Sequence, residues 1–247
     1  MTVRVPSVIL VAHTETLNNN TLQIMRTKTL LLAAATLAVS LVTSQAQVYS
    51  GIVGYSTLSL TNGFNLICNP LDDDGTGTNN TLQTVFSTNL PNATAVYIFS
   101  AGSWQHVTYV ASTGKWLGNG LTNLANAALN PGFGVMVQVP ASPATNVVVP
   151  LVGNVLQGSF TNPIPAGLQI VSCVDPLSGT LDTNLMYAPT KQDKVYTWNS
   201  TIQNYNSVAP TWSGTTWLGG DPNLQVAQPI FLNAKSNTVW IVNFTAQ

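Results

Sequence analysis

The chain contains very few charged residues. Only 6% of its 247 residues are Asp, Glu, Lys or Arg, against about a quarter in an ordinary soluble domain. Asn, Thr, Ser and Gln supply the polarity instead, and the hydrophobic content argues against disorder, which needs low hydrophobicity and high net charge. After residue 28 the few lysines are scattered, so no basic patch exists for nucleic-acid phosphates. The composition is typical of an extracellular β protein.

Residues that do chemistry are also scarce. After residue 46 the sequence has one histidine, His106, and no glutamate. A hydrolytic triad needs a base held beside a nucleophile, and no Gly-x-Ser-x-Gly elbow is present. Zinc needs three or four suitable ligands. The aspartates, which could in principle form the carboxylate pair of a glycosidase, lie in turns. These absences predict a protein that is not an enzyme.

The chain has only two cysteines, Cys68 and Cys173. Export favours a disulfide between them. In steps of two along each predicted strand, Cys68 falls on the face of Phe64, whereas Cys173 falls on the face opposite Leu168. This difference favours two buried free cysteines. A bulge before Pro176 would change the face assigned to Cys173, so a disulfide between the two cysteines remains an alternative.

The N-terminal region has the pattern of a signal peptide. Arg26 and Lys28 precede an apolar run over residues 29–42, and Ser44 and Ala46 fit a cleavage site. We expect a signal peptide at residues 25–46, with Met25 as the true start and residues 1–24 as a mis-called start or an upstream extension. An anchor helix is the alternative, but the run is short for a membrane span. The prediction is a secreted protein, extracellular or at the cell surface, with the periplasm as an alternative and no membrane span after cleavage.

The rest of the chain contains an internal sequence repeat. Residues 63–71 (GFNLICNPL) return about a hundred residues later as residues 167–177 (GLQIVSCVDPL). Three further landmarks recur in the same order at a similar offset, which predicts a duplication into units 47–153 and 154–247. These landmarks are Tyr97-Ile98-Phe99 with Tyr196-Thr197-Trp198, Trp116-Leu117-Gly118 with Trp217-Leu218-Gly219, and Val135-Met136-Val137-Gln138 with Ile230-Phe231-Leu232-Asn233.

Both units consist of short strand patterns separated by Gly, Pro and Asn turns. Beyond the signal peptide, the only helical pattern is a single turn at residues 81–86. The prediction is an all-β fold of two tandem β-sandwich-like units after a cleaved N-terminal signal helix. The expected strands are residues 52–60 and 64–68, a hairpin over 95–110 that turns at 100–103, residues 133–139 with 145–152 as partner, a second hairpin over 194–208, and residues 229–233 and 238–244, while the region around 115–118 is expected to be a loop.

Tryptophans are the main candidates for ligand binding. Trp104 and His106 alternate with Val107 and Tyr109, so we expect the latter pair in the core and the former pair exposed. An exposed aromatic ring can stack on a sugar. Trp104 is the better candidate because no aromatic residue is found at its expected equivalent in the second unit. Two further candidates, Trp116 and Trp217, lie in the repeated Trp-Leu-Gly, which favours the alternative that each plugs one end of a sandwich.

A turn-rich acidic loop covers residues 72–80. Asp72, Asp74 and neighbouring oxygens could bind calcium, which takes six to eight oxygen ligands. No acidic residue closes this loop, however, and the matching loop after Pro176 is not acidic. The alternative is a solvated loop without metal.

The pattern resembles a large group of uncharacterised secreted proteins of environmental bacteria. These proteins carry a Gly-aromatic-Asn-Leu-Ile-x-Asn-Pro strand, a Val-Tyr-x-aromatic hairpin and a Pro-Gly-x-Gly-hydrophobic strand, found here at residues 63–70, 96–99 and 131–135. The second unit departs from the pattern, with Asp175 in place of Asn69 and Pro229 in place of Gly134. The resemblance implies a β-sandwich-like module in an extracellular location, and it transfers no catalytic residue.

Two functions from different classes remain. The first is a non-catalytic structural protein of the cell surface or matrix that self-assembles through strand edges, with itself or other surface proteins as partners. The second is a carbohydrate-binding or adhesive module that holds polysaccharide on exposed tryptophans. The first is favoured by the low charge, the tandem units and the missing catalytic residues.

Overall fold

The computed structural model describes residues 51–86, 90–100, 102–118, 124–142 and 146–245. The predicted signal peptide and the segment upstream of it lie outside these ranges. Gly51–Gln247 form one compact unit. In the described ranges the one helix is α2 (Leu82–Phe86), and none is long and apolar enough to cross a membrane.

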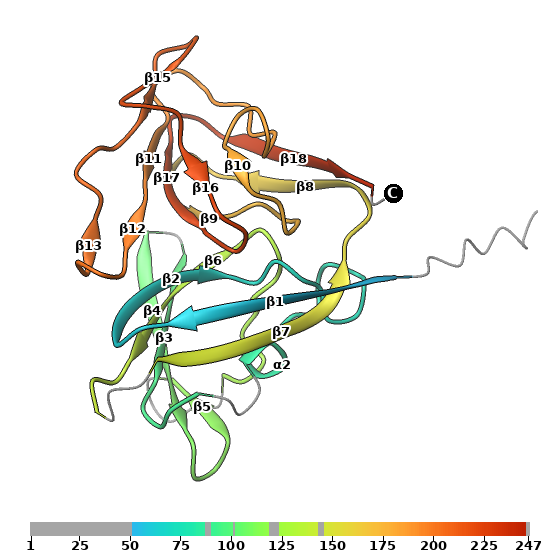
Figure 1. The fold of residues 1–247 in the computed structure, drawn as a ribbon, viewed down its shortest axis with the longest axis vertical. Coiled ribbons are helices and arrows are strands. Elements are labelled where there is room, and N and C mark those ends of the chain that lie inside the picture. The colour runs from blue at the N-terminus through green and yellow to red at the C-terminus, as the bar shows by residue number, and fades with distance from the viewer. Residues whose placement is uncertain (1–50, 87–89, 101, 119–123, 143–145, 246–247) are drawn as a thin grey trace, which may run out of the picture. The chain divides into compact units, whose positions relative to one another are not determined.

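The first half of this unit consists of two facing antiparallel sheets (Figure 1). A two-stranded ribbon and a five-stranded sheet in the order β2-β6-β3-β4-β5 enclose a core that includes Leu58, Ile67, Val137 and Val149. In the two strands of the ribbon, buried side chains alternate with exposed ones, which places Leu58 and Val149 inward. The ribbon is formed by β1 (Ile52–Leu60) and β7 (Val147–Val155), and the sheet by β2 (Gly63–Cys68), β6 (Gly134–Val139), β3 (Ala95–Ser100), β4 (Ser103–Val110) and β5 (Lys115–Leu117).

The second half has a similar arrangement with two additional short strand pairs. Its five-stranded sheet has the order β9-β17-β11-β14-β15, and its ribbon pairs β8 with β18. The all-β, sandwich-like fold is therefore confirmed. The elements are β8 (Gly158–Ile164), β9 (Gly167–Val171), β10 (Gly179–Thr180), β11 (Lys194–Tyr196), β12 (Trp198–Asn199), β13 (Asn204–Tyr205), β14 (Thr211–Trp212), β15 (Trp217–Leu218), β16 (Asn223–Leu224), β17 (Ile230–Ala234) and β18 (Thr238–Phe244), with β10 paired to β16 and β12 paired to β13.

The correspondence between the halves extends to individual backbone conformations. Ala93 and Gln192 each take a positive φ, of 64° and 76°, at the same place before β3 and β11. The amide of Ala93 donates to the carbonyl of Tyr109 at 2.9 Å, and that of Gln192 donates to the carbonyl of Trp212 at 2.9 Å. A non-glycine residue with positive φ is uncommon, so its recurrence at matched positions is what the predicted duplication would produce.

Two details of the predicted topology were wrong. The strand expected to pair with residues 133–139 is β7, which pairs with β1, for example Val152 with Tyr55. It cannot pair with β6, because β2 and β3 already occupy both edges of that strand. Residues 115–117, expected as a loop, form the edge strand β5.

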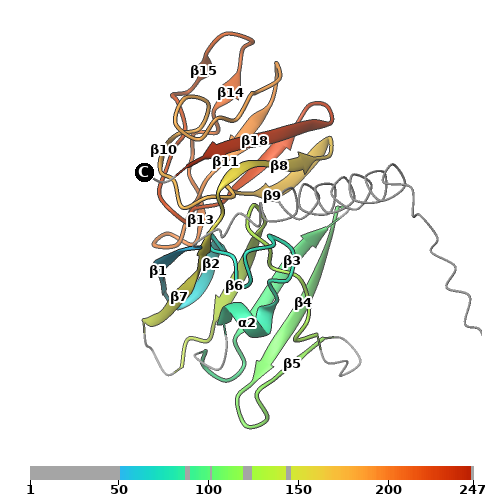
Figure 2. The same cartoon turned by 90° about the vertical axis from the view of Figure 1, so that its right-hand side faces the viewer.

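The two halves are joined by an apolar layer between their five-stranded sheets. The face of β2 turned to the core of the first half carries Ile67, and Phe64 and Leu66 lie on the opposite face. Phe64 and Leu66 pack instead with side chains of the second half, where β9 lies beside β3 and β6 (Figure 2). Each five-stranded sheet is thus apolar on both faces. This layer, the interface cluster, contains Met136, Ile170 and Phe231, with Phe64, Leu66, Tyr97, Phe99, Tyr196 and Trp198 packed against them.

Candidate functional site

Trp104 and His106 lie on the exposed face of β4, as predicted. Trp104 is 47% exposed. Its ring centre lies 5.0 Å from that of Phe99 and 6.1 Å from that of Phe231. His106 stacks on Tyr97 with ring centres 5.6 Å apart. One side of the Trp104 ring therefore packs against Phe99 and Phe231 of the interface cluster, and the rest of the ring is accessible to a ligand.

The prediction that Trp104 lacks an aromatic equivalent was wrong. In the first hairpin Trp104 lies opposite Phe99, and in the second hairpin Tyr205 lies opposite Trp198. Tyr205 contacts Phe231 as well, with ring centres 5.3 Å apart. The second hairpin has a longer loop, between the paired residues 199 and 204 rather than 100 and 103. A fixed sequence offset therefore misaligns the second strands of the two hairpins.

Trp116 and Trp217 are buried, so the structure contradicts their assignment as ligand-binding residues. Trp116 is fully enclosed, with its ring centre 5.0 Å from Tyr109 and 5.8 Å from Phe86. Trp217 packs edge-on against Trp212 at 5.3 Å. Each lies on the last strand of its five-stranded sheet and fills the core beneath it. The burial of both residues agrees with the alternative prediction, in which each tryptophan plugs one end of its half.

The acidic loop is held together by hydrogen bonds to its own aspartates. Asp72 is fully buried, and its Oδ1 accepts a hydrogen bond from Nδ2 of Asn80 at 2.5 Å. Asp74 is exposed, and hydrogen bonds from Thr76 and then Asn79 lower its pKa to about 2. Among the described residues no group of three or more His, Cys, Asp or Glu could hold a metal. In this geometry Asp72 and Asp74 brace the loop itself.

Cys68 and Cys173 are both buried and unbonded to each other. Cys173 belongs to the core cluster of the second half. Burial raises the pKa of the Cys68 thiol to about 12 and that of Cys173 to about 11. Both thiols are therefore protonated and unreactive at neutral pH, and they act as small apolar side chains.

The outer face of the β1–β7 ribbon is apolar and open. Val53 and Tyr55 of β1 are 69% and 71% exposed, and Val148 and Val152 of β7 are 57% and 64% exposed. Neither strand contains a charged residue. We call these four side chains the ribbon face. These four residues were not predicted as a site, although apolar residues on both faces of the two strand segments were a signal in the sequence.

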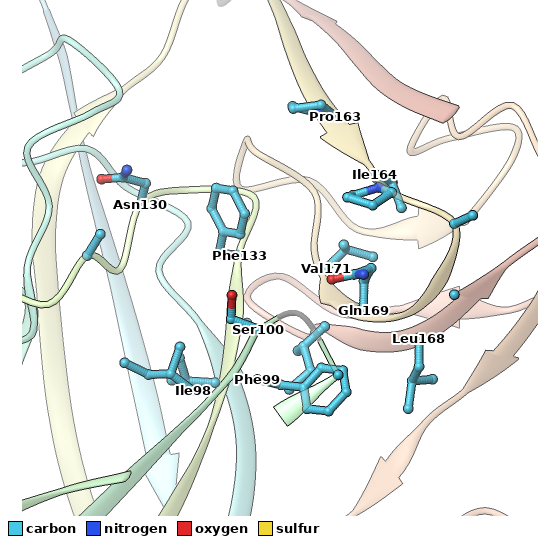
Figure 3. A pocket seen from close by; sticks show the side chains of 18 residues that line it. Ile98, Phe99, Ser100, Asn130, Phe133, Pro163, Ile164, Leu168, Gln169 and Val171 are labelled. Atoms are coloured by element: carbon cyan, nitrogen blue, oxygen red, sulfur yellow. The ribbon is translucent and has the colours of Figure 1, made fainter. Parts of the chain in front are cut away.

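A groove of about 770 Å³ lies beside β9 (Figure 3). Ile98, Phe99 and Phe133 of the first half and Ile164 and Leu168 of the second half are among its lining residues, and none of the described residues that line it is charged. Sequence reasoning could not find this groove, because its walls come from both halves and exist only once these have packed together.

Comparison with protein-family models, curated proteins and solved structures found no match for this chain. The ribbon face, Trp104 and the groove are therefore the features from which a function can be inferred.

Proposed function

We propose that this protein is a secreted, non-catalytic structural protein that self-associates through the ribbon face and the free edge of β1. The observation that carries the proposal is the exposure of four large apolar side chains, Val53, Tyr55, Val148 and Val152, on one surface of a two-stranded sheet. Scattered exposed apolar residues are normal, but contiguous apolar patches on a monomer mark interaction sites.

The edge of β1 supports the same conclusion. Edge strands that must stay unpaired are usually protected by a charged residue, a proline, a bulge or a covering loop. Over nine residues β1 contains neither a charge nor a proline, and among the described strands it pairs with β7 alone. Its partner β7 carries Pro150 near its middle. We therefore infer that β1 supplies the edge for intermolecular pairing.

The expected strength per contact is modest. Burying a side chain of this size contributes about 1.5–3 kcal/mol when it passes from full exposure to full burial. Four partly exposed side chains thus contribute roughly 4–8 kcal/mol before the loss of translational and rotational freedom, which costs a similar amount. A single contact is weak by this estimate, so assembly depends on repeated contacts at high local concentration.

Light scattering over a concentration series tests the proposal. The wild-type mass should grow with concentration, and Tyr55→Lys or Val152→Lys should hold the protein monomeric, because these neighbouring positions bring charge to the centre of the ribbon face. Thr215→Lys, in an exposed loop of the second half, is the matched control and should assemble like wild type. Calcium should change nothing, because Asp72 is buried. A wild-type monomer at every concentration, or unimpaired assembly of Tyr55→Lys, would sink the proposal.

Carbohydrate binding is the second candidate, and the open ring of Trp104 beside the His106–Tyr97 stack favours it. Retention on insoluble polysaccharide should then be lost in Trp104→Ala and kept in Tyr55→Lys. The opposite pattern, or no retention of the wild type, removes this candidate.

A further inference from the structure

The edge of β2 in the first half is closed by a side chain. The amide of Phe64 donates to Oε1 of Gln203 at 2.6 Å, and Nε2 of Gln203 donates to the carbonyl of Phe64 at 3.1 Å. Nε1 of Trp198 donates to the same carbonyl at 3.0 Å. One carboxamide thus supplies the acceptor and the donor that the peptide groups of a neighbouring strand would supply.

Leu168 holds the equivalent position on β9. Phe64 lies opposite Gln138 of β6, and Leu168 lies opposite Asn233 of β17. Further along the same edge of β9, the amide of Ser172 donates to the carbonyl of Gly132 at 3.1 Å. Because backbone groups alternate between the two edges of a strand, the N–H and C=O of Leu168 point to the edge that β17 does not occupy.

No carboxamide closes this second edge. Gln203 directly precedes β13, and the residue that directly precedes β4 is Gly102. Both have positive φ, 52° for Gln203 and 76° for Gly102. The two halves thus share the backbone conformation at this point, and the first half lacks the side chain. In the described structure no hydrogen-bonding partner for Leu168 is found on its outer edge.

The groove runs along this open edge. Phe133 lies in it with a half-exposed side chain, and Leu168 lines it from β9 (Figure 3). Phe99 and Ile170 belong both to the groove and to the interface cluster, so the groove continues the surface through which the two halves already recognise each other. The absence of charged lining residues disfavours a charged occupant, because a charge placed here would lose hydration without gaining a partner.

We propose that the groove is a binding site for an extended, uncharged segment of a partner polypeptide. Its main chain pairs with the N–H and C=O of Leu168, in the way that the carboxamide of Gln203 pairs with Phe64, and its apolar side chains pack on Phe133 and Phe99. This is strand addition to a sheet edge, where backbone hydrogen bonds supply affinity and side-chain contacts supply selectivity. The site is separate from the ribbon face.

The probe is the uncharged pentapeptide acetyl-Val-Thr-Val-Thr-Val-amide, titrated into the 15N-labelled protein and followed by NMR. Saturable shifts are expected at the amide of Leu168 and its neighbours on β9. The same peptide N-methylated at its central valine keeps the apolar surface and loses one donor. It should bind about tenfold more weakly, since a lost hydrogen bond of about 1.4 kcal/mol corresponds to that factor.

Two reciprocal variants test the link to Gln203. Gly102→Gln introduces the closing carboxamide, and a Cβ there meets nothing within 4 Å, so peptide affinity should fall at least fivefold. Gly114→Gln is the matched control, because Gly114 has a positive φ of 63° and equally open surroundings on the next hairpin. It should bind like wild type. Gln203→Gly should expose the edge of β2 and add a second set of shifts at Phe64.

Several results would overturn the proposal. These are no shift at Leu168, equal binding of the N-methylated peptide, or unchanged affinity in Gly102→Gln. Shifts at Leu168 that depend on protein concentration alone would identify a second copy as the occupant. Tighter binding of tri-N-acetylchitotriose at the same amides would assign the site to acetamido sugars. Tyr55→Lys should leave peptide binding intact, so failure of this site and failure of self-association are distinguishable.

Discussion

Gly134 and Pro229 occupy equivalent positions, at the start of β6 and just before β17, and they face each other across the boundary between the two halves. A Cβ added at Gly134 would lie 2.8 Å from Cβ of Pro229 and 2.4 Å from Cγ2 of Ile170. The two sheets therefore approach at this point as closely as their atoms allow, and a residue without a side chain is required on one side.

Gly134→Ala should destabilise the protein by about 1–3 kcal/mol through overpacking of this contact. Urea unfolding would measure the loss. Ile170→Ala removes the nearest colliding methyl group, so the double variant should lose less than the sum of the two single losses. Strict additivity would mean that the contact does not limit how closely the sheets pack.

Asp175 should make stability fall as the pH rises. The residue is buried, neither carboxylate oxygen has a hydrogen-bonding partner among the described residues, and burial raises its pKa from 3.8 to about 6. Below about pH 3 the carboxyl is protonated in both the folded and unfolded states and has no effect. Between about pH 4 and 6 ionisation favours the unfolded state, and the loss reaches about 3 kcal/mol above pH 6.

Asp175→Asn tests this prediction with the residue found at the equivalent position, Asn69, whose amide donates to Asn80 and to the carbonyl of Leu129. The variant should match wild type near about pH 3 and exceed its free energy of unfolding by up to about 3 kcal/mol at pH 7. Asp73→Asn, at an exposed position, is the control. A constant difference between Asp175→Asn and wild type across this range would show that Asp175 does not titrate with a raised pKa.

Asp193 should be a major contributor to the stability of the second half. Its buried carboxylate accepts hydrogen bonds from the hydroxyl of Tyr187 at 2.6 Å and from the amides of Thr190 and Lys235, each at 2.7 Å. Asp193→Ala leaves three donors without a partner and should cost about 3 kcal/mol or more. Asp73→Ala, at an exposed position, should change the free energy of unfolding by less than about 0.5 kcal/mol. Similar small losses for both variants would contradict this role.

The tryptophans should separate into two classes. Trp116→Ala empties a fully buried site and should lower the free energy of unfolding by about 3–5 kcal/mol. Trp104→Ala removes a half-exposed ring and should cost about 1 kcal/mol. Thermal unfolding of the two variants would measure both losses of stability, and an equal loss would mean that Trp104 is as important to the fold as Trp116.

Local patterns were readable from the sequence. The bounds of β1 and the hairpin of β3 and β4 were predicted correctly, because alternation and turn residues are contained within each segment, and the burial of Val107 and Tyr109 followed from the same alternation. The partner of β7 was predicted wrongly, because strand pairing across ninety residues leaves no local trace.

The candidate site was less accessible to sequence reasoning. The exposure of Trp104 followed from strand parity, but the match of Trp104 with Tyr205 depended on a loop length that no fixed offset reproduces. The open edge at Leu168 is visible only by comparison with Phe64, whose partner Gln203 lies 139 positions away in the chain. Neither pairing is encoded in a single segment.

The double-sided five-stranded sheets make each half an incomplete protein. A separated first half would expose Phe64 and Leu66 to water and would tend to associate with a second copy of itself. In a homodimer with the same packing as the two halves, Gly134 would face Gly134 and leave a void, whereas two copies of the second half would bring Pro229 against Pro229. The two halves of the chain therefore resemble the subunits of a heterodimer, in which a glycine of one subunit packs against a proline of the other.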